Sequence, residues 1–495
     1  MHHTLEQARA FEARYGQFIP EDQRPAFHLT PTIGWMNDPN GFSRYRGEYH
    51  LFYQYHPYST EWGPMHWGHV KTRDFLHWER LPVALAPDQP YDQGGCFSGS
   101  AVELDDGRQL LVYTGVQKHL TDDGRTLETQ TQCLALGDGV NYEKYPANPV
   151  LTQKDLPEGG SPVDFRDPKV WREADGSYRM VVGNRPADQS GAVLLYQSLD
   201  GFTWSLVGQV DASHCQYGMM WECPDFFPLD GKQVLLTSPQ EMSPIGLEFH
   251  AGNGTVCIIG SYDRENNRFV REHIQAVDYG IDFYAPQTLE TEDGRRVMIG
   301  WMQNWNTIAG KPRDCRWFGQ MSLPRELSIR DGRLIQTPVR ELEQYRRNPV
   351  RYQDVLLNNE ETNLHNVSGR KIDLTLTVRP ANSTPYSCFR VSLAKDGEYV
   401  TTLRYKPDTS ILKIDRTRSG SNADIVHTRS LMVRPQGGVL KLRLILDRYS
   451  VEAFVNDGEQ AASVAIFTRQ EAAAISFDAV GAVLLDVEKY DIVLD

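Results

Sequence analysis

The sequence predicts an all-β fold, in which a five-bladed β-propeller is followed by a C-terminal antiparallel β-sandwich. From residue 26 onward, short apolar or aromatic runs alternate with turns rich in Gly, Asp, Asn and Pro. Five of these runs follow a turn glycine at similar intervals. Beyond residue 349 a second series of alternating strands begins. The 495 residues are enough for about two to four domains.

An N-terminal helical extension is expected over residues 1–25, because apolar residues recur at helical spacing within 4–15. These residues are Leu5, Ala8, Phe11 and Tyr15. The chain start lacks the basic and apolar run of a secretory signal, and no run of about 18 apolar residues occurs. Seven cysteines without a CxxC pair fit a reducing compartment. We therefore expect a cytoplasmic protein with no membrane partner.

The propeller is predicted over residues 26–337 from repeated hairpins, since Asp-Gly is a strong hairpin signal and Gly tolerates positive φ. The turn glycines are Gly47, Gly107, Gly176, Gly231 and Gly294, at intervals of 60, 69, 55 and 63 residues. A second repeat, TRDFLHW (72–78) and SLDGFTW (198–204), has an offset of 126 residues, close to two such periods. Similar sheets around one axis form a propeller. Unrelated hairpins in a large sandwich are the alternative.

A helical linker is expected over residues 338–348 and the sandwich over residues 349–495. The strands of the sandwich alternate apolar and polar residues, as in KIDLTLTVRP, VLKLRLILD and SVEAFVND. This part of the chain shows no cluster of residue types that carry catalysis. We expect it to pack against the propeller, to contact another subunit or to bind sugar.

Three carboxylates occupy the same place in three of the repeats. The residues nine positions before the turn glycines are Asp38, Ser98, Asp167, Glu222 and Ala285. In a propeller the first strand of each blade lines the central channel. Equivalent positions on these strands therefore bring three carboxylates and one hydroxyl to one axis.

Converging carboxylates repel one another when all are ionised, so one of them should have a raised pKa. Glycosidic cleavage needs this arrangement, because one carboxylic acid protonates the leaving oxygen while a second carboxylate attacks the sugar or activates water. Taken singly, Asp38 and Asp167 precede proline and could be turn residues, and Glu222 could form an ion pair on a strand. Their shared offset favours a catalytic site.

The residues around these strands favour a small hydroxylated ligand, since aromatic faces and fixed polar groups suit a sugar ring. Substrate contacts are expected from Trp35, Asn37, Gln54, Trp62, Phe97, Ser98, Arg166, Tyr284 and Trp301. No metal site is predicted, because His66, His69 and His77 lack a nearby acidic ligand pattern. The formal charge of −14 argues against a nucleic-acid partner.

At these residues the sequence resembles glycoside hydrolase family 32, the family of invertases, sucrose-6-phosphate hydrolases and exo-fructanases. The resemblance covers residues 26–495. Its first three motifs resemble the family's nucleophile, RDP and acid/base motifs, and the others match further family segments. The six segments are WMNDPNG (35–41), FRDP (165–168), WECP (221–224), FSGS (97–100), SLPREL (322–327) and DRYSVEAFVNDGE (447–459).

The resemblance implies a retaining β-fructofuranosidase that needs no metal or organic cofactor. Asp38 would be the nucleophile that forms a fructosyl-enzyme, and Glu222 would be the general acid and then the general base for water. Asp167, with Arg166, would hold fructose hydroxyls and stabilise the transition state. The expected substrates are sucrose, sucrose 6-phosphate and short fructo-oligosaccharides.

Other functions remain open at this point. An exo-inulinase or levanase would use the same carboxylates on longer fructans, and fructosyl transfer would differ only in the acceptor. An arabinan-type hydrolase also uses three acids, but WMNDPNG and WECP favour the fructosidase. A non-catalytic sugar-binding propeller would not need three clustered acids. A phosphorylated substrate could meet basic residues at the rim, namely Lys311, Arg313 and Arg316. A sandwich edge could support a homodimer.

Overall fold

The computed structural model describes residues 4–120, 124–312, 314–383 and 385–494. It is all-β, with 54% strand and 6% helix. The predicted N-terminal helix is α1 (Leu5–Tyr15), which begins with a capping box formed by Thr4 and Gln7. The other described helices are short 3-10 turns: η1 (Gly16–Phe18), η2 (Glu21–Gln23), η3 (Gln153–Asp155), η4 (Ile308–Gly310) and η5 (Arg340–Tyr345). No described helix is long and apolar enough to cross a membrane.

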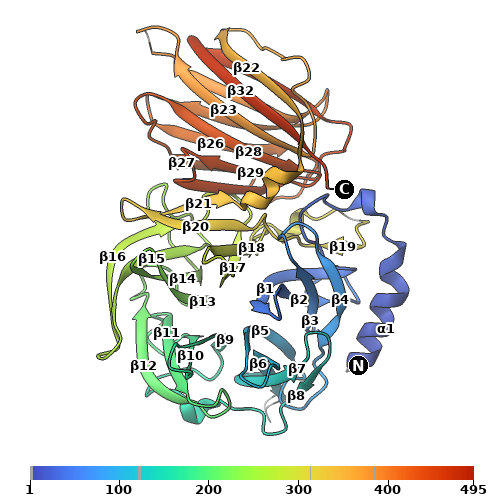
Figure 1. The fold of residues 1–495 in the computed structure, drawn as a ribbon, viewed down its shortest axis with the longest axis vertical. Coiled ribbons are helices and arrows are strands. Elements are labelled where there is room, and N and C mark those ends of the chain that lie inside the picture. The colour runs from blue at the N-terminus through green and yellow to red at the C-terminus, as the bar shows by residue number, and fades with distance from the viewer. Residues whose placement is uncertain (1–3, 121–123, 313, 384, 495) are drawn as a thin grey trace.

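Five sheets follow one another along the described residues up to Pro338 (Figure 1). The first contains β1 (Gly34–Tyr45), β2 (Glu48–His56), β3 (His66–Thr72) and β4 (Glu79–Leu85). The second contains β5 (Gly95–Glu103), β6 (Gln109–Leu120), β7 (Thr126–Gly137) and β8 (Tyr142–Lys144). The third contains β9 (Phe165–Arg172), β10 (Tyr178–Asn184), β11 (Ala192–Ser198) and β12 (Ser205–Ala212).

The fourth and fifth sheets complete this series. The fourth contains β13 (Met220–Leu229), β14 (Lys232–Gln240), β15 (Val256–Asp263) and β16 (Arg268–Ala276). The fifth contains β17 (Tyr284–Glu290), β18 (Arg296–Trp301), β20 (Arg325–Arg330) and β21 (Arg333–Pro338). Between β18 and β20, the short strand β19 (Trp317–Phe318) leaves this sheet and pairs in parallel with β1. The last sheet is thereby joined to the first.

The first strands of the five sheets lie around a common centre. β1 contacts β5, β5 contacts β9, β9 contacts β13, β13 contacts β17, and β17 contacts β1 again. In Figure 1 these five labels surround the middle of the lower part of the molecule. All five predicted turn glycines have positive φ, between 77° and 87°. The predicted hairpins are therefore confirmed.

The second sequence repeat forms two matching turns. Each turn joins the third and fourth strands of its sheet, in the first sheet and in the third. In both, a hydroxyl accepts the amide three residues further on at 2.9 Å, and an Asp carboxylate accepts two more amides. These residues are Thr72 and Asp74 in one turn, and Ser198 and Asp200 in the other. The offset of 126 residues thus corresponds to two sheets.

Two further sheets pack face to face after η5. One has the order β22 (Arg346–Asn358), β32 (Ala482–Ile492), β23 (Ile372–Pro380), β28 (Leu440–Asp447), β29 (Ser450–Val455) and β30 (Gln460–Ala465). The other has the order β27 (Thr428–Met432), β26 (Ile411–Arg418), β25 (Val400–Lys406), β24 (Cys388–Lys395) and β31 (Ala474–Val480). Buried side chains from both fill the space between them, among them Leu374, Leu444, Phe389 and Phe477.

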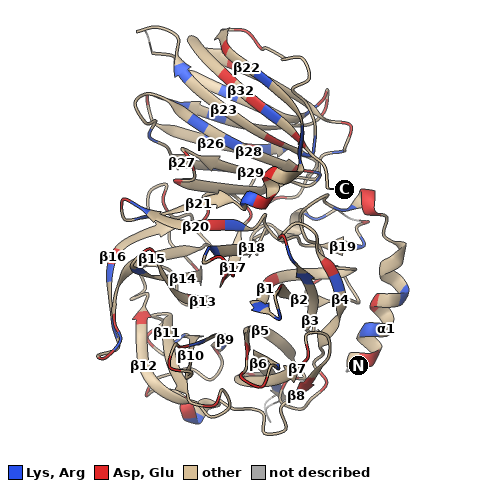
Figure 2. Cartoon of the chain, viewed as in Figure 1, with Lys and Arg blue, Asp and Glu red and all other residues tan. Residues whose placement is uncertain are grey.

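The outward face of the six-stranded sheet carries charges of both signs. Blue and red positions alternate along β22, β32 and β23 in Figure 2. Arg351 pairs with Glu488 at 2.8 Å, and Arg379 pairs with Asp486 at 2.5 Å. Such cross-strand pairs of opposite charge stabilise a sheet on its solvated face. This face is therefore polar, while the opposite face of the same sheet forms the core.

Buried charged residues hold the two groups of sheets together. Arg325 on β20 pairs with Glu452 on β29 at 2.6 Å and with Asp278 at 3.0 Å. His28 lies 2.9 Å from both Asp447 and Glu452. Burial disfavours a charge on His28, but its hydrogen bonds to the two carboxylates raise its pKa to about 9. The SLPREL and DRYSVEAFVNDGE segments thus meet in one buried charge cluster.

Candidate active site

Each of the five first strands is interrupted by a β-bulge. The extra residues at these bulges are Asp38, Ser98, Asp167, Cys223 and Ala285. A bulge takes a residue out of the ladder and turns its side chain in a new direction. At Asp167, Cys223 and Ala285 the bulge has positive φ (67°, 47° and 51°), and the next residue is proline. Proline has no amide hydrogen to donate, so a bulge accommodates it without losing a ladder bond.

Glu222 is the exception to the predicted equivalence, because it lies one residue before the bulge of β13. The turn between β13 and β14 has two residues, whereas the turns that follow β5, β9 and β17 have five. The turn after β1 also has two residues, but a second bulge between Asn40 and Ser43 lengthens that strand. A count of nine residues back from Gly231 therefore ends at Glu222, one residue before the bulge at Cys223. The expectation of five equivalent positions is wrong for Glu222.

Asp38 is oriented by donors from three strands. Ser98 Oγ donates to Asp38 Oδ2 at 2.7 Å, and Asn37 Nδ2 donates to Oδ1 at 3.0 Å. The Cys223 thiol lies 3.6 Å from Oδ2. Trp35 Nε1 donates to Asn37 Oδ1 at 2.7 Å and so fixes the amide that holds the carboxylate. These contacts place Asp38 in one orientation before any ligand arrives.

Asp167 lies beside Asp38 and shares a neighbour with it. The Cys223 amide donates to Asp167 Oδ2 at 2.9 Å, and the Cys223 thiol lies 3.6 Å from the same oxygen. The Asp167 amide donates to Thr114 Oγ1 at 3.0 Å. Because one thiol contacts both carboxylates, the bulges of β1 and β9 are brought together at the bulge of β13.

Glu222 is held by a guanidinium group and a hydroxyl. Arg166 Nε donates to Glu222 Oε1 at 3.0 Å, and the Tyr284 hydroxyl donates to Oε2 at 2.6 Å. Arg166 also pairs with Asp164 at 2.6 Å. The Glu222 side chain keeps 15% of its surface exposed. It is therefore fixed in position yet remains accessible to a ligand.

Burial and mutual repulsion make it hard to ionise all three acids together. Burial, and then the charge of Glu222, raise the pKa of Asp38 to about 6. Burial also raises the pKa of Asp167; Arg166 opposes this shift, while Glu222 and Asp38 add to it. The site therefore retains a proton more readily than separate carboxylates would.

Asp38→Asn should stabilise the fold increasingly as the pH rises. The pKa of Asp38 in the folded protein, about 6, lies above its ordinary value of 3.8. Its contribution to stability is thus complete below pH 3.8 and is lost as the pH rises through 6. Asn avoids this loss, which amounts to at most about 3 kcal/mol. Melting temperatures at pH 4.5 and pH 8 check this. A gain of the same size at both pH values, or an equal gain in the exposed-site variant Asp188→Asn, would contradict it.

Four of the predicted substrate-binding residues contact the acids directly. Asn37 and Ser98 donate to Asp38, and Arg166 and Tyr284 donate to Glu222. Tyr284 is fully buried, and its hydroxyl contributes to the site by holding the carboxylate of Glu222. These residues form the polar wall of the site.

The remaining predicted residues lie at different depths. Gln54 faces the bulge of Asn37 and Asp38 on the neighbouring strand, and it donates to the Cys96 carbonyl at 3.0 Å. The Trp62 side chain is 42% exposed and meets the Phe97 ring edge-on at 6.1 Å. Trp35 and Trp301 are buried and lie 5.9 Å apart. Trp301 thus packs behind Trp35 rather than facing solvent.

Sequence reasoning missed Cys223 and Trp305. Cys223 directly follows Glu222 in WECP. The count of nine residues from Gly231 ends at Glu222, so it does not point to the bulge at Cys223. Trp305 stacks on Trp35 at 6.0 Å. At the rim, Lys311 pairs with Glu61, and Arg316 donates to the Phe18 carbonyl at 3.4 Å. Arg313 lies outside the described residues.

The histidines considered as metal ligands have other contacts. His69 lies 2.9 Å from His50, and His77 lies 2.6 Å from Asp74. His66 lies 2.9 Å from the Pro64 carbonyl. Within the described ranges, no group of three or more His, Cys, Asp or Glu residues is arranged to hold a metal ion.

Two family models match this chain. Residues 28–338 match the glycosyl hydrolases family 32 N-terminal domain, and residues 341–492 match the glycosyl hydrolases family 32 C terminal. The raffinose invertase of Escherichia coli is 40% identical over 91% of this chain and 91% of its own length. A sucrose-6-phosphate hydrolase of Escherichia coli is 37% identical over 95% of this chain and 93% of its own length.

A solved structure agrees with these sequence relatives. The GH32 beta-fructofuranosidase of Bombyx mori is 33% identical and superposes with a TM-score of 0.83. The match covers 98% of this chain and 97% of the Bombyx mori chain. The chain belongs to glycosyl hydrolase family 32.

Proposed function

We propose that this protein is a β-fructofuranosidase, a retaining hydrolase that releases terminal β-D-fructofuranosyl residues from sucrose, sucrose 6-phosphate or short fructo-oligosaccharides. The observation that carries the proposal is the meeting of Asp38, Asp167 and Glu222 in one site, where Cys223 contacts both aspartates and Glu222 is held by Arg166 and Tyr284. Relatives named raffinose invertase and sucrose-6-phosphate hydrolase support the substrate class.

The reaction proceeds in two displacements. The Asp38 carboxylate attacks the anomeric carbon, while the carboxyl group of Glu222 gives its proton to the leaving oxygen. A covalent fructosyl-enzyme results. Glu222, now a carboxylate, takes a proton from water, and that water releases fructose from Asp38. Carboxyl groups alone supply nucleophile, acid and base, so this chemistry calls for no metal or organic cofactor.

The neighbouring residues hold the sugar and the acids in place. Asp167 accepts hydrogen bonds from fructose hydroxyls, and Arg166 fixes the acid through its contact with Glu222. Ser98 and Asn37 donate to Asp38 and so favour its attacking, ionised form. Trp62 and Phe97 provide apolar faces for the sugar ring. Tyr284 steadies Glu222, and Gln54, Trp35 and Trp301 support this wall.

The five sheets are proposed to be the blades of a propeller over residues 26–337. The closed succession of first strands and the two matching turns support it. The N-terminal extension (1–25), the linker (338–348) and the sandwich (349–495) complete the proposed organisation. In this proposal the enzyme acts in the cytoplasm on small sugars, with no nucleic-acid partner. A homodimer through a sandwich edge stays a prediction.

An exo-acting fructanase is the second candidate. The levanase of Bacillus subtilis is 35% identical over 92% of this chain and 68% of its own length. As a fructanase, this chain would use the same residues in the same roles, because the bond cleaved is also a β-fructofuranosyl linkage. The two candidates differ in the leaving group rather than in the reacting sugar.

Steady-state kinetics on sucrose, sucrose 6-phosphate, kestose and inulin test the proposal. We expect the wild type to hydrolyse at least one short substrate, with Asp38→Asn as the inactive control. The order of kcat/KM then identifies the leaving group, and a preference for inulin would favour the fructanase. If no β-fructoside is cleaved but sugars still bind, the protein is a sugar-binding propeller instead.

A further inference from the structure

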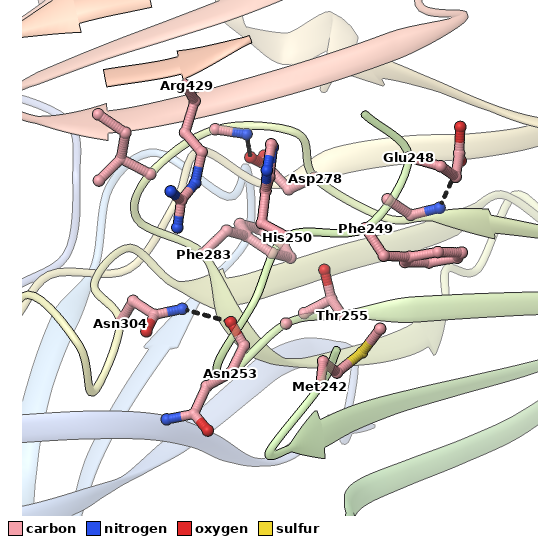
Figure 3. A pocket seen from close by; sticks show the side chains of 14 residues that line it. Met242, Glu248, Phe249, His250, Asn253, Thr255, Asp278, Phe283, Asn304 and Arg429 are labelled. Atoms are coloured by element: carbon pink, nitrogen blue, oxygen red, sulfur yellow. Dashed lines mark hydrogen bonds between the residues drawn. The ribbon is translucent and has the colours of Figure 1, made fainter. Parts of the chain in front are cut away.

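A small cavity lies between the two groups of sheets and shares no lining residue with the site described above. Its volume is about 30 Å³, room for about two water molecules or one small ion. Its walls come from the segments 242–255 and 276–283, from Asn304 beyond β18, and from Arg429 on β27 (Figure 3). Anything bound there would touch both groups of sheets.

Two nitrogen donors in this cavity have no hydrogen-bond partner among the described residues. In Figure 3 the guanidinium of Arg429 and the ring of His250 point into the same space. Arg429 Nε and His250 Nε2 are buried and have no hydrogen-bond partner in the described part of the chain. A buried donor without an acceptor costs about 1–3 kcal/mol, so such groups normally have a partner.

Nearby carboxylates do not fill this gap, because other groups already engage them. Asp282, whose charge acts on Arg429, pairs with Arg416 and accepts the Ala465 amide at 2.8 Å. Asp278, which lines the cavity, pairs with Arg325 at 3.0 Å. Among the described residues Arg429 therefore forms no ion pair of its own, and it shares the charge of Asp282 with Arg416.

Glu248 is the other acid in the wall. Its Oε1 accepts the Ala276 amide at 2.9 Å and the Tyr279 hydroxyl at 2.6 Å. In Figure 3 it lies beside Phe249, apart from Arg429 and His250. Burial lowers the pKa of Arg429, and burial together with the Arg429 charge lowers the pKa of His250 to about 4. Burial is the largest cause of both shifts, and the second cause at His250 shows that the charge of Arg429 reaches the imidazole.

We propose that this cavity binds one small inorganic anion, of the size of chloride, between Arg429 and His250. The anion accepts from Arg429 Nε and from the Nε2–H of the neutral imidazole. It thereby satisfies two buried donors and supplies a counter-charge. Since Arg429 belongs to the sandwich and His250 to the sheets around the active site, the bound anion joins the two.

Thermal unfolding tests the proposal on the full chain. Melting temperatures are measured against sodium phosphate and, separately, sodium chloride, with ionic strength held constant by a bulky organic buffer anion. A ligand of the folded state raises the melting temperature in a concentration-dependent way. We expect such a rise in the wild type with chloride, and phosphate serves as the anion that is too large for the cavity. In Arg429→Gln the apparent dissociation constant should increase at least 10-fold.

Two further variants separate a site from a general salt effect. Arg404→Gln removes an exposed arginine from the same sheet and should respond as the wild type does. Arg429→Lys keeps the charge and should retain part of the response, which also guards against a folding defect in Arg429→Gln. The proposal is overturned if the wild type shows no chloride-dependent rise, or if Arg429→Gln and Arg404→Gln respond equally.

Discussion

Asp38→Asn should lower kcat for sucrose by about 10⁴-fold or more, because the amide cannot form the fructosyl-enzyme. The loss should appear in kcat and kcat/KM alike, since the carboxylate acts in bond making rather than in ground-state binding. Ser98 and Asn37 donate to different oxygens of Asp38, so the single amide oxygen of the variant can accept only one of these two hydrogen bonds in place. Initial rates of glucose release measure the effect.

The matched control is Asp188→Asn, which removes an exposed carboxylate that accepts hydrogen bonds from Ser190 in its own turn. It should keep kcat within about threefold of the wild type, as expected for a surface substitution. A kcat for Asp38→Asn within tenfold of the wild type would remove Asp38 from the role of nucleophile. The melting temperature of Asp38→Asn at pH 8 shows whether that variant is folded.

Glu222→Gln should lower kcat for sucrose by about 10²–10⁴-fold, the usual contribution of a general acid or base. Gln retains an oxygen that can accept from Arg166 or Tyr284, but it has no proton to give to the leaving oxygen. A β-fructoside with an acidic phenol as leaving group does not need that proton. The first step should therefore recover with such a substrate, and the fructosyl-enzyme should accumulate.

Azide distinguishes the two carboxylates. In Glu222→Gln, azide should release the accumulated intermediate without base assistance and give a fructosyl azide of retained configuration. In Asp38→Asn no intermediate exists to be rescued in this way. Glu241→Gln, at an exposed residue paired with Arg185 at 3.0 Å, is the matched control and should need no rescue. A Glu222→Gln variant slowed equally on both leaving groups would argue against the acid role.

The sequence was sufficient to predict the hairpins, because their signal is local. The turn glycines need positive φ, and that need is visible as Asp-Gly or Arg-Gly before an apolar run. The matching turns at Thr72 and Ser198 also depend on contacts within a few residues. The pairing of β19 with β1 could not be predicted, since it joins residues nearly 300 positions apart along the chain.

The three acids were also predicted, although the reasoning was only partly sound. Asp38 and Asp167 occupy matching bulges. Glu222 also lies nine residues before its turn glycine, but the short turn after β13 places the bulge one residue later, at Cys223. Turn length and a second bulge leave no clear mark in a single sequence. The burial of Trp301 and the contact of the Cys223 thiol with two carboxylates depend on packing between sheets, which the repeat pattern does not contain.

The buried cluster of His28, Arg325, Asp447 and Glu452 limits how this protein can be recombined with its relatives. Leu323 donates its amide to Glu452 at 2.7 Å, and the adjacent Ser322 bonds to Gly300, next to Trp301. A chimaera whose C-terminal half lacked Asp447 and Glu452 would leave protonated His28 buried without these carboxylates and Arg325 with Asp278 as its remaining acid. Exchange of the halves should therefore succeed only when these four residues travel as a set.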